Sequence, residues 1–162
     1  MQNNTEQNYI EILKDSLNKK LRVLDEIISV NNIQAEILKA EELDYAAFDK
    51  TIADKDRCID EIRLLDKGFQ TVYDRIKELF EKNKSLYAED IKLMQEQITR
   101  LTEKSMDIQS QEARNKESFQ NRVILSRREI KTAKTANKVA ANYYQSMNRL
   151  NVVDSQFLDT KK

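Results

Sequence analysis

Residues 44–80 read DYAAFDKTIADKDRCIDEIRLLDKGFQTVYDRIKELF. Large apolar residues return along this stretch at intervals of three and four, the spacing of a helix with one apolar face. They are Phe48, Ile52, Ile59, Ile62, Phe69, Val72, Ile76, Leu79 and Phe80, with Lys55 and Leu65 or Asp66 at intervening positions. A helix with a one-sided apolar face has to bury it against other helices. The stretch therefore predicts a helical bundle organised around residues 44–80.

The composition of the whole chain points to the same fold class. Its 162 residues include no proline and a single glycine, and 35% of them are charged. This leaves almost no residues for hairpin turns and is typical of long helices and coiled coils. The glycine, Gly68, allows either a continuous helix or a bend at that point. We expect an all-α protein that forms one domain.

Two further helices are expected to complete the body of the bundle. Breaks in the apolar spacing predict helices over about residues 5–40, 44–82 and 85–118. Because the connections are short, consecutive helices run antiparallel, and the body is an elongated three-helix bundle or coiled coil. Asn31 is the one polar residue on the apolar face of the first helix. It either fixes the register of the packing or is a partly exposed position near a fraying end.

The apolar spacing weakens near the end of the third helix, where Ser105, Glu112 and Asn115 stand at positions that should be apolar. Since little is left there to bury, residues 119–162 are expected to be partly uncoupled from the body. They form a basic, helical and partly mobile extension of the same domain, with a disordered tail.

The extension carries an apolar stripe that is rich in alanine and then in tyrosine and methionine. Its members are Phe119, Val123, Ile130, Ala133, Ala136, Ala140, Tyr144, Met147 and Leu150. Small residues let another helix approach closely, while methionine and tyrosine supply adaptable contact area for an apolar helix of another protein. The alternative is that the stripe packs back on the bundle as ordinary core. The residues alone leave both open.

The charges are unevenly distributed, although the net charge is zero. Residues 1–112 carry 24 acidic and 17 basic side chains, whereas residues 113–162 carry 4 acidic and 11 basic ones. The basic run comprises Arg122, Arg127, Arg128, Lys131, Lys134 and Lys138. A solvated face is the first interpretation, followed by an acidic protein partner or the chain folding back on itself. Nucleic acid is not expected as a partner, because no nucleic-acid-binding motif accompanies the run.

The chain lacks the residues of most catalytic sites. It has no histidine to act as a base or as a metal ligand, and no glycine-rich loop to hold phosphate. Carboxylates four residues apart, such as Asp56 and Asp60, are common on so acidic a helix. Cys58 is expected to be a small, semi-buried residue rather than a reactive thiol. We expect no enzyme activity, no cofactor and no metal site.

The beginning of the chain, MQNNTEQNYIE, has neither the basic region nor the apolar run of a secretion signal. No stretch approaches the ~18 apolar residues of a membrane span. The sequence is therefore expected to give a cytoplasmic protein without membrane insertion.

The stretch LDYAAFDKTIADKDRCIDEIRLLD, residues 43–66, resembles the second helix of the FlgN-type flagellar export chaperones. The matching features are the Asp–hydrophobic start, a leucine-type position, a lysine in a charged pair, and regular aliphatic residues. They fall at Leu43–Asp44, Phe48, Asp54–Lys55, Ile59, Ile62 and Leu65. Further on, IQSQEARNKESF resembles the polar stretch that ends the bundle of that family, with Asn115 matching one asparagine and Ala113–Arg114 standing where another is expected. The tail NVVDSQFLD is also similar to those of the family, and the resemblance spans most of residues 9–120.

The resemblance implies a cytoplasmic chaperone of type III export. Such proteins bind the C-terminal helices of hook–filament junction proteins and deliver them to the flagellar export apparatus. The client-binding part would be the C-terminal helical stripe, and Tyr143 or Tyr144 would dock on the export gate. A FliT-type chaperone of the filament cap protein and a structural coiled-coil adaptor are the alternatives. Which client is bound and in what oligomeric state are open.

Overall fold

The computed structural model describes the backbone of residues 4–126 and 133–159 and the side chains of residues 5–123 and 134–151. This part of the chain forms four α-helices. In chain order they are α1 (Asn4–Lys39), α2 (Tyr45–Lys82), α3 (Ala88–Ser126) and α4 (Ala133–Asp159). None of these described residues lies in a strand. The expected all-α fold is confirmed.

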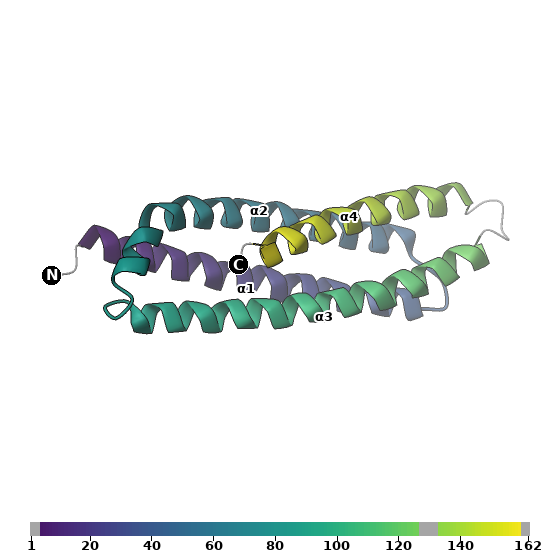
Figure 1. Ribbon diagram of the computed structural model, residues 1–162. Helices are drawn as coiled ribbons and strands as arrows, with labels where there is room; N and C mark the ends of the chain where they lie inside the picture. The colour runs from purple at the N-terminus through teal and green to yellow at the C-terminus, as the bar shows by residue number, and fades with distance from the viewer. Residues whose placement is uncertain (1–3, 127–132, 160–162) are drawn as a thin grey trace.

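The helices lie side by side along one long axis, and each runs opposite to the helix before it (Figure 1). α1 packs against α2 and α3, and α4 packs against the same two helices. α1 and α4 are therefore diagonal neighbours in the bundle, as are α2 and α3. The structure differs here from the expected three-helix bundle with an extension, because a fourth helix joins the packing.

The boundary expected at residue 119 is also wrong. α3 continues without a break to Ser126, so Phe119 and Val123 belong to the third helix and not to a separate C-terminal segment. α4 then returns along α2 and α3 but covers only part of their length, ending well before the α2–α3 turn (Figure 1). The end of the bundle next to that turn is thus built from three of the described helices.

A capping residue sets the start of the central helix. Asp44 precedes α2 with extended backbone angles, and its Oδ1 accepts a hydrogen bond from the amide of Ala47 at 3.0 Å. This bond satisfies one of the amides that the first turn of a helix leaves unpaired. Asp44 is therefore the N-cap of α2, which begins at Tyr45, close to the start at residue 44 that the sequence predicted.

Most of the predicted apolar face of α2 is buried. The buried members are Phe48, Ile52, Ile59, Ile62, Ile76 and Phe80. Two apolar clusters share them. The larger joins α1, α2 and α3 along the bundle, and the smaller lies where α4 covers the ends of α2 and α3. The period of the sequence therefore identified the packing face correctly.

Gly68 lies inside α2, which is continuous from Tyr45 to Lys82, and its φ is not positive. A Cβ atom added at Gly68 would meet nothing within 4 Å. Since glycine has more freedom to lose on folding than alanine, we expect Gly68→Ala to raise the free energy of unfolding by about 0.5–1 kcal/mol. Urea unfolding followed by circular dichroism would measure this; a loss of stability would show that the helix needs glycine there.

Candidate functional site

An aromatic cluster anchors α4 to the bundle. Tyr143 of α4 is fully buried against Phe48 of α2 and Phe119 of α3. Its ring is edge-on to both, with ring centroids 5.1 Å and 5.0 Å away, while Phe48 and Phe119 stack on each other at 4.8 Å. Edge-to-face and stacked pairs are the favourable arrangements of aromatic rings. Tyr143 therefore joins α4 to both α2 and α3 through ring contacts.

A buried lysine lies beside these rings. The side chain of Lys55 is 1% exposed, and its Nζ donates to Glu112 Oε1 at 2.6 Å. It also donates to the side-chain oxygens of Asn31 and Gln34, both at 3.1 Å. The Nζ lies 5.3 Å from the centroid of the Tyr143 ring, a cation–π contact. Three oxygen acceptors and a ring face thus compensate a charge that is costly to bury.

Further hydrogen bonds extend this group across α1, α2 and α3. Asn115 Nδ2 donates to the Asn31 carbonyl at 3.0 Å and to Gln34 Oε1 at 3.4 Å. Gln34 Nε2 in turn donates to Thr51 Oγ1 at 2.9 Å. We call the set the buried polar cluster. It consists of Asn31, Gln34, Thr51, Lys55, Glu112 and Asn115, all of them buried.

This cluster corrects the expectation that the end of the third helix has little to bury. Ser105, Glu112 and Asn115 are buried, so α3 stays packed along this stretch. Asn31 is 1% exposed, which excludes the interpretation as a partly exposed position. The residues of the buried polar cluster fit in the core because they lie at the same height on α1, α2 and α3, where they supply one another with hydrogen-bond partners that an apolar side chain could not.

The surroundings change the acid–base behaviour of two members of the site. Burial lowers the pKa of the Lys55 ammonium, against the opposite pull of the Glu112 carboxylate. Burial also raises the pKa of the Tyr143 hydroxyl, and the negative charge of Glu112 adds to the shift. Among the described residues, the Tyr143 hydroxyl finds no hydrogen-bond partner. Tyr143 therefore holds α4 by packing and not through its hydroxyl.

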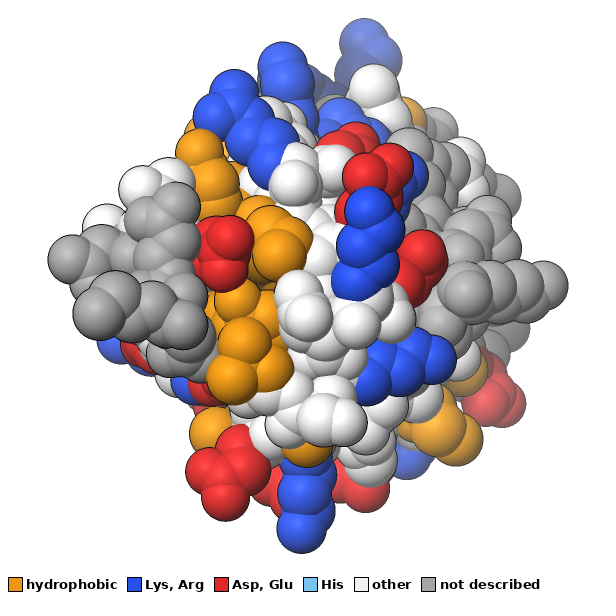
Figure 2. All heavy atoms as spheres, turned by 60° about the vertical axis from the view of Figure 1, so that its left-hand side comes forward, with side chains coloured by type: hydrophobic (Ala, Val, Ile, Leu, Met, Phe, Trp, Pro, Cys, Tyr) orange, Lys and Arg blue, Asp and Glu red, His pale blue; other side chains and the backbone are white. Residues whose placement is uncertain are grey.

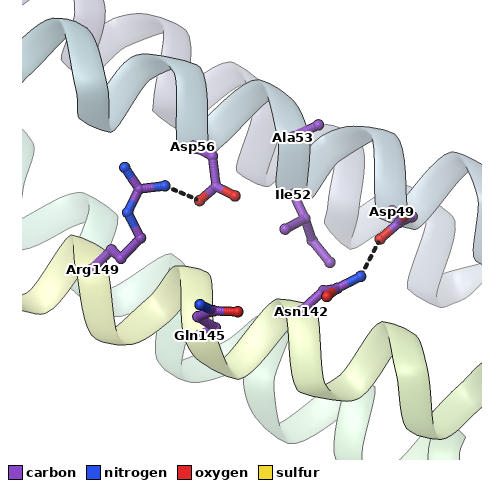
Figure 3. A pocket seen from close by; sticks show the side chains of 7 residues that line it. All are labelled: Asp49, Ile52, Ala53, Asp56, Asn142, Gln145 and Arg149. Carbon is purple, nitrogen blue, oxygen red and sulfur yellow. Dashed lines mark hydrogen bonds and ion pairs between the residues drawn. The ribbon is translucent and has the colours of Figure 1, made fainter.

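A hollow of about 330 Å³ lies between α2 and α4, and most of the side chains that line it are polar. Asn142 Nδ2 donates to Asp49 Oδ1 at 3.3 Å, and Arg149 Nη1 lies 3.2 Å from Asp56 Oδ1 (Figure 3). Arg149 also pairs with Asp60. The basic C-terminal part of the chain therefore folds back on the acidic α2 at this point, one of the outcomes that the charge distribution left open.

The stripe proposed for client binding lies mostly inside the bundle. Phe119, Val123, Ala136, Ala140 and Leu150 are buried, whereas Tyr144 and Met147 are half-buried. Ile130 lies outside the described residues, and the side chain of Ala133 is not among those described. Of the two tyrosines proposed for docking, Tyr143 is buried and Tyr144 is partly accessible.

The basic run is only partly described. Arg122 is half-buried and donates to the backbone carbonyl of Glu41 at 3.1 Å, whereas Lys134 and Lys138 are exposed on α4. Arg127, Arg128 and Lys131 lie outside the described side chains. The described part fits the interpretation as a solvated face.

Cys58 is fully buried in the larger apolar cluster, whereas the sequence predicted a semi-buried side chain. Burial raises the pKa of its thiol from 9.0 to about 12, with a contribution from Glu26. Since the thiolate is the reactive form, we expect iodoacetamide to modify the native protein at pH 8 roughly 100-fold more slowly than the protein in guanidinium chloride.

The raised pKa also makes stability depend on pH. Between pH 9 and 12 the Cys58 thiol stays protonated in the native state, whereas in the unfolded state it loses its proton. The contribution of Cys58 to stability is thus present below pH 9 and is lost as the pH rises further.

Mass spectrometry of the intact protein measures the labelling, since a single cysteine gives a single adduct. Equal rates for the native and unfolded protein would contradict burial of the thiol.

A second open region, the distal groove, lies at the end of the bundle that α4 does not reach. It has a volume of about 520 Å³ and is formed by α2, α3 and the turn between them. Its lining residues are Phe69, Tyr73, Lys77, Phe80, Glu81, Lys84, Ala88, Ile91, Met94, Gln95 and Ile98. Viewed from the left-hand end of Figure 1, apolar side chains gather in a band among basic and acidic ones (Figure 2).

Comparisons with known proteins give no relative for this chain: no family model, no curated protein and no solved structure matches it. Among the described residues, no group of acidic or cysteine side chains is arranged to hold a metal ion. None of the described helices combines the length and the apolar character needed to cross a bilayer.

Sequence reasoning missed two features of the site. The first is the buried polar cluster, because the sequence gives Lys55 a place in the apolar spacing and in the family resemblance but no buried partner. A signal did exist, because Asn31, Lys55 and Glu112 all interrupt apolar faces, and such interruptions can pair when their helices align. The second is the distal groove, which has no signal in the sequence because it arises where α4 ends.

Proposed function

We propose that this protein is a FlgN-type export chaperone in the cytoplasm, which binds the C-terminal helices of hook–filament junction proteins and delivers them to the flagellar export apparatus. The observation that carries the proposal is the way α4 is held. Its inner face presents Ala136 and Ala140 for close approach and Tyr143 as a fully buried aromatic anchor. These are the features of an amphipathic helix that lies in a groove of a partner.

The burial of this face has a mechanistic consequence. A client helix that contacts it must first separate α4 from α2 and α3. Among the described side chains of α4, three kinds of contact resist this. They are the aromatic cluster, the burial of small and aliphatic residues (Ala136, Val139, Ala140 and Leu150), and partly exposed polar pairs such as Arg149 with Asp56, which contribute at most about 1 kcal/mol each. Opening a single helix costs less than unfolding the whole bundle, so α4 can exchange its own contacts for those of a client.

Two positions that carry the resemblance support the same assignment. Lys55 and Asn115 both donate to Gln34 Oε1, so both belong to the cluster behind Tyr143. The hydrogen bonds of Lys55 and Asn115 in this cluster keep α1, α2 and α3 in register while α4 moves. Tyr144, which is partly accessible, is the tyrosine available for docking on the export gate with α4 in place.

Amide hydrogen exchange tests the proposal. The protein is mixed with a synthetic peptide covering the C-terminal 40 or so residues of a junction protein from the source organism. We expect residues 134–151 to exchange faster than α1 in the free protein and to become protected by the peptide. A peptide from the filament cap protein is the matched control, because protection by that peptide alone would favour the FliT-type alternative.

A structural adaptor would give a different result. In that case α4 is permanent core, so residues 134–151 would be strongly protected in the free protein and unchanged by either peptide. This outcome would overturn the chaperone proposal. The buried Tyr143 is the observation that makes the adaptor a real alternative.

A further inference from the structure

We infer that the distal groove is a second docking site, and that its occupant is an amphipathic α-helix of another protein with large apolar side chains along about three turns. This goes beyond the proposed function, which places client binding on α4 at the other half of the molecule.

The first argument is continuity with an interface that the fold already uses. α4 packs on α2 and α3 and not on α1. The distal groove is also lined by α2 and α3 and by no residue of α1. It therefore continues the seam between α2 and α3, on which α4 packs, beyond the end of α4. Figure 1 shows α2 and α3 running on towards their turn after α4 has ended. A seam that holds one helix along its first part offers the same backbone geometry to another helix along the rest.

The second argument is the size and chemistry of the lining. From Phe69 to Phe80 the α2 wall is about 16 Å long, which matches about three turns of an added helix. Phe69, Tyr73 and Phe80 form a row of rings, with centroid distances of 6.0 Å and 6.5 Å between neighbours. Tyr73 is 38% exposed in the groove, and together with Leu64 it is one of the two exposed large apolar side chains of α2.

The volume explains why large side chains are needed. The alanine face of α4 suits a tight contact, whereas a hollow of about 520 Å³ would stay unfilled by a helix of that kind. Leucine, methionine and phenylalanine fill such a groove. Among the described residues Lys84, at the edge of the groove, has no ion pair, so an acidic residue beside the apolar stripe of the occupant would find a partner there.

A second copy of this chain fits less well as the occupant. Among the described side chains, the exposed large apolar ones outside the groove are Ile12, Ile33, Leu64, Leu86, Leu93 and Met106. They are spread over α1, α2, α3 and the α2–α3 turn, and no described helix exposes them on three successive turns. The partner is therefore expected to be a different protein.

The test uses the full chain and a stapled 18-residue helix with leucine and phenylalanine on one face and glutamate and lysine on the other, labelled with fluorescein. We expect fluorescence anisotropy to show saturable binding that Tyr73→Glu weakens at least tenfold. Leu64→Glu is the matched control, since Leu64 is an exposed α2 residue outside the groove, and it should leave the affinity unchanged. The same peptide with alanine on its apolar face should bind at least tenfold more weakly.

A reporter in the groove keeps the test independent of the effect of Tyr73→Glu on folding. Lys84→Cys labelled with bimane should change its emission on addition of the peptide. Equal binding to the wild type and Tyr73→Glu, equal binding of the alanine peptide, or an unchanged bimane signal would overturn the inference. So would sedimentation showing a dimer that Tyr73→Glu dissociates, because the occupant would then be a second copy.

The two proposals can fail separately. Failure of the stapled helix to bind, with protection of residues 134–151 by a junction-protein peptide, would reject the distal groove and leave the chaperone proposal standing. Binding of the stapled helix with no response to any junction-protein peptide would do the reverse.

Discussion

Replacing Lys55 by methionine is expected to lower the free energy of unfolding by about 3–5 kcal/mol. The substitution removes the only ammonium from the buried polar cluster and leaves the Glu112 carboxylate without the partner that lies 2.6 Å away. Asn31 and Gln34 lose a donor as well. Unpartnered buried acceptors and an uncompensated charge are among the largest destabilising changes available to a single substitution.

The matched control is the same substitution at an exposed ion pair. Lys39 lies 3.4 Å from Glu36, and both side chains are more than 70% exposed, so Lys39→Met should cost less than about 1 kcal/mol. Urea unfolding of both variants measures the difference. A loss at Lys55→Met no larger than at Lys39→Met would show that the cluster does not hold the helices together.

A double variant separates the pair from its surroundings. Replacing both Lys55 and Glu112 by methionine removes the charge together with its counter-charge, so the double variant should be more stable than Lys55→Met alone. The double-mutant cycle built from these variants and Glu112→Met gives the coupling energy of the pair. A double variant with the summed loss of both single variants would mean that the two side chains act independently.

The fold class could be predicted because it depends on period and composition alone. The spacing of Phe48, Ile52 and Ile59, the lack of proline and the single glycine determine long helices with one apolar face. The start of α2 could be placed because Asp44 signals its own capping role. These features are local, so they can be interpreted without knowing what packs against what.

The packing of α4 and the polar cluster could not be predicted, because both depend on the relative height of the helices. Gln34 and Asn115 are 81 residues apart and form a hydrogen bond. Asn31 and Glu112 have the same offset, and both accept a hydrogen bond from Lys55 where α1 and α3 lie side by side. Each residue alone looks like a defect in an apolar face. Only their coincidence at one level lets them form a hydrogen-bonded cluster, and that cluster keeps α3 packed along this stretch.

Tyr143→Ala is expected to release α4 and to cost about 3–5 kcal/mol, the usual loss when a large buried aromatic side chain is removed. Tyr143 contacts Phe48 and Phe119 and covers Lys55, so its removal leaves a cavity and uncovers the polar cluster. We expect the amides of residues 134–151 to exchange much faster, while those of the larger apolar cluster in α1 and α2 keep most of their protection.

Two neighbouring variants give the controls. Tyr143→Phe keeps the ring and removes only a buried hydroxyl that has no partner among the described residues, so its stability should match or slightly exceed that of the wild type. Tyr144→Ala changes the adjacent, half-buried tyrosine and should cost less than about 2 kcal/mol. A loss at Tyr143→Phe equal to that at Tyr143→Ala would mean that the hydroxyl, and not the ring, holds α4.

The Tyr143→Ala variant also connects stability to the proposed function. If a client must displace α4, part of its binding free energy is spent on opening, and Tyr143→Ala removes most of that cost. Each 1.4 kcal/mol saved strengthens the apparent affinity tenfold, provided that Tyr143 itself makes no contact with the client. A junction-protein peptide should therefore bind Tyr143→Ala at least tenfold more tightly than the wild type, as measured by isothermal titration calorimetry. Weaker binding would instead make Tyr143 part of the surface that the client contacts, since losing that contact would outweigh the easier opening of α4.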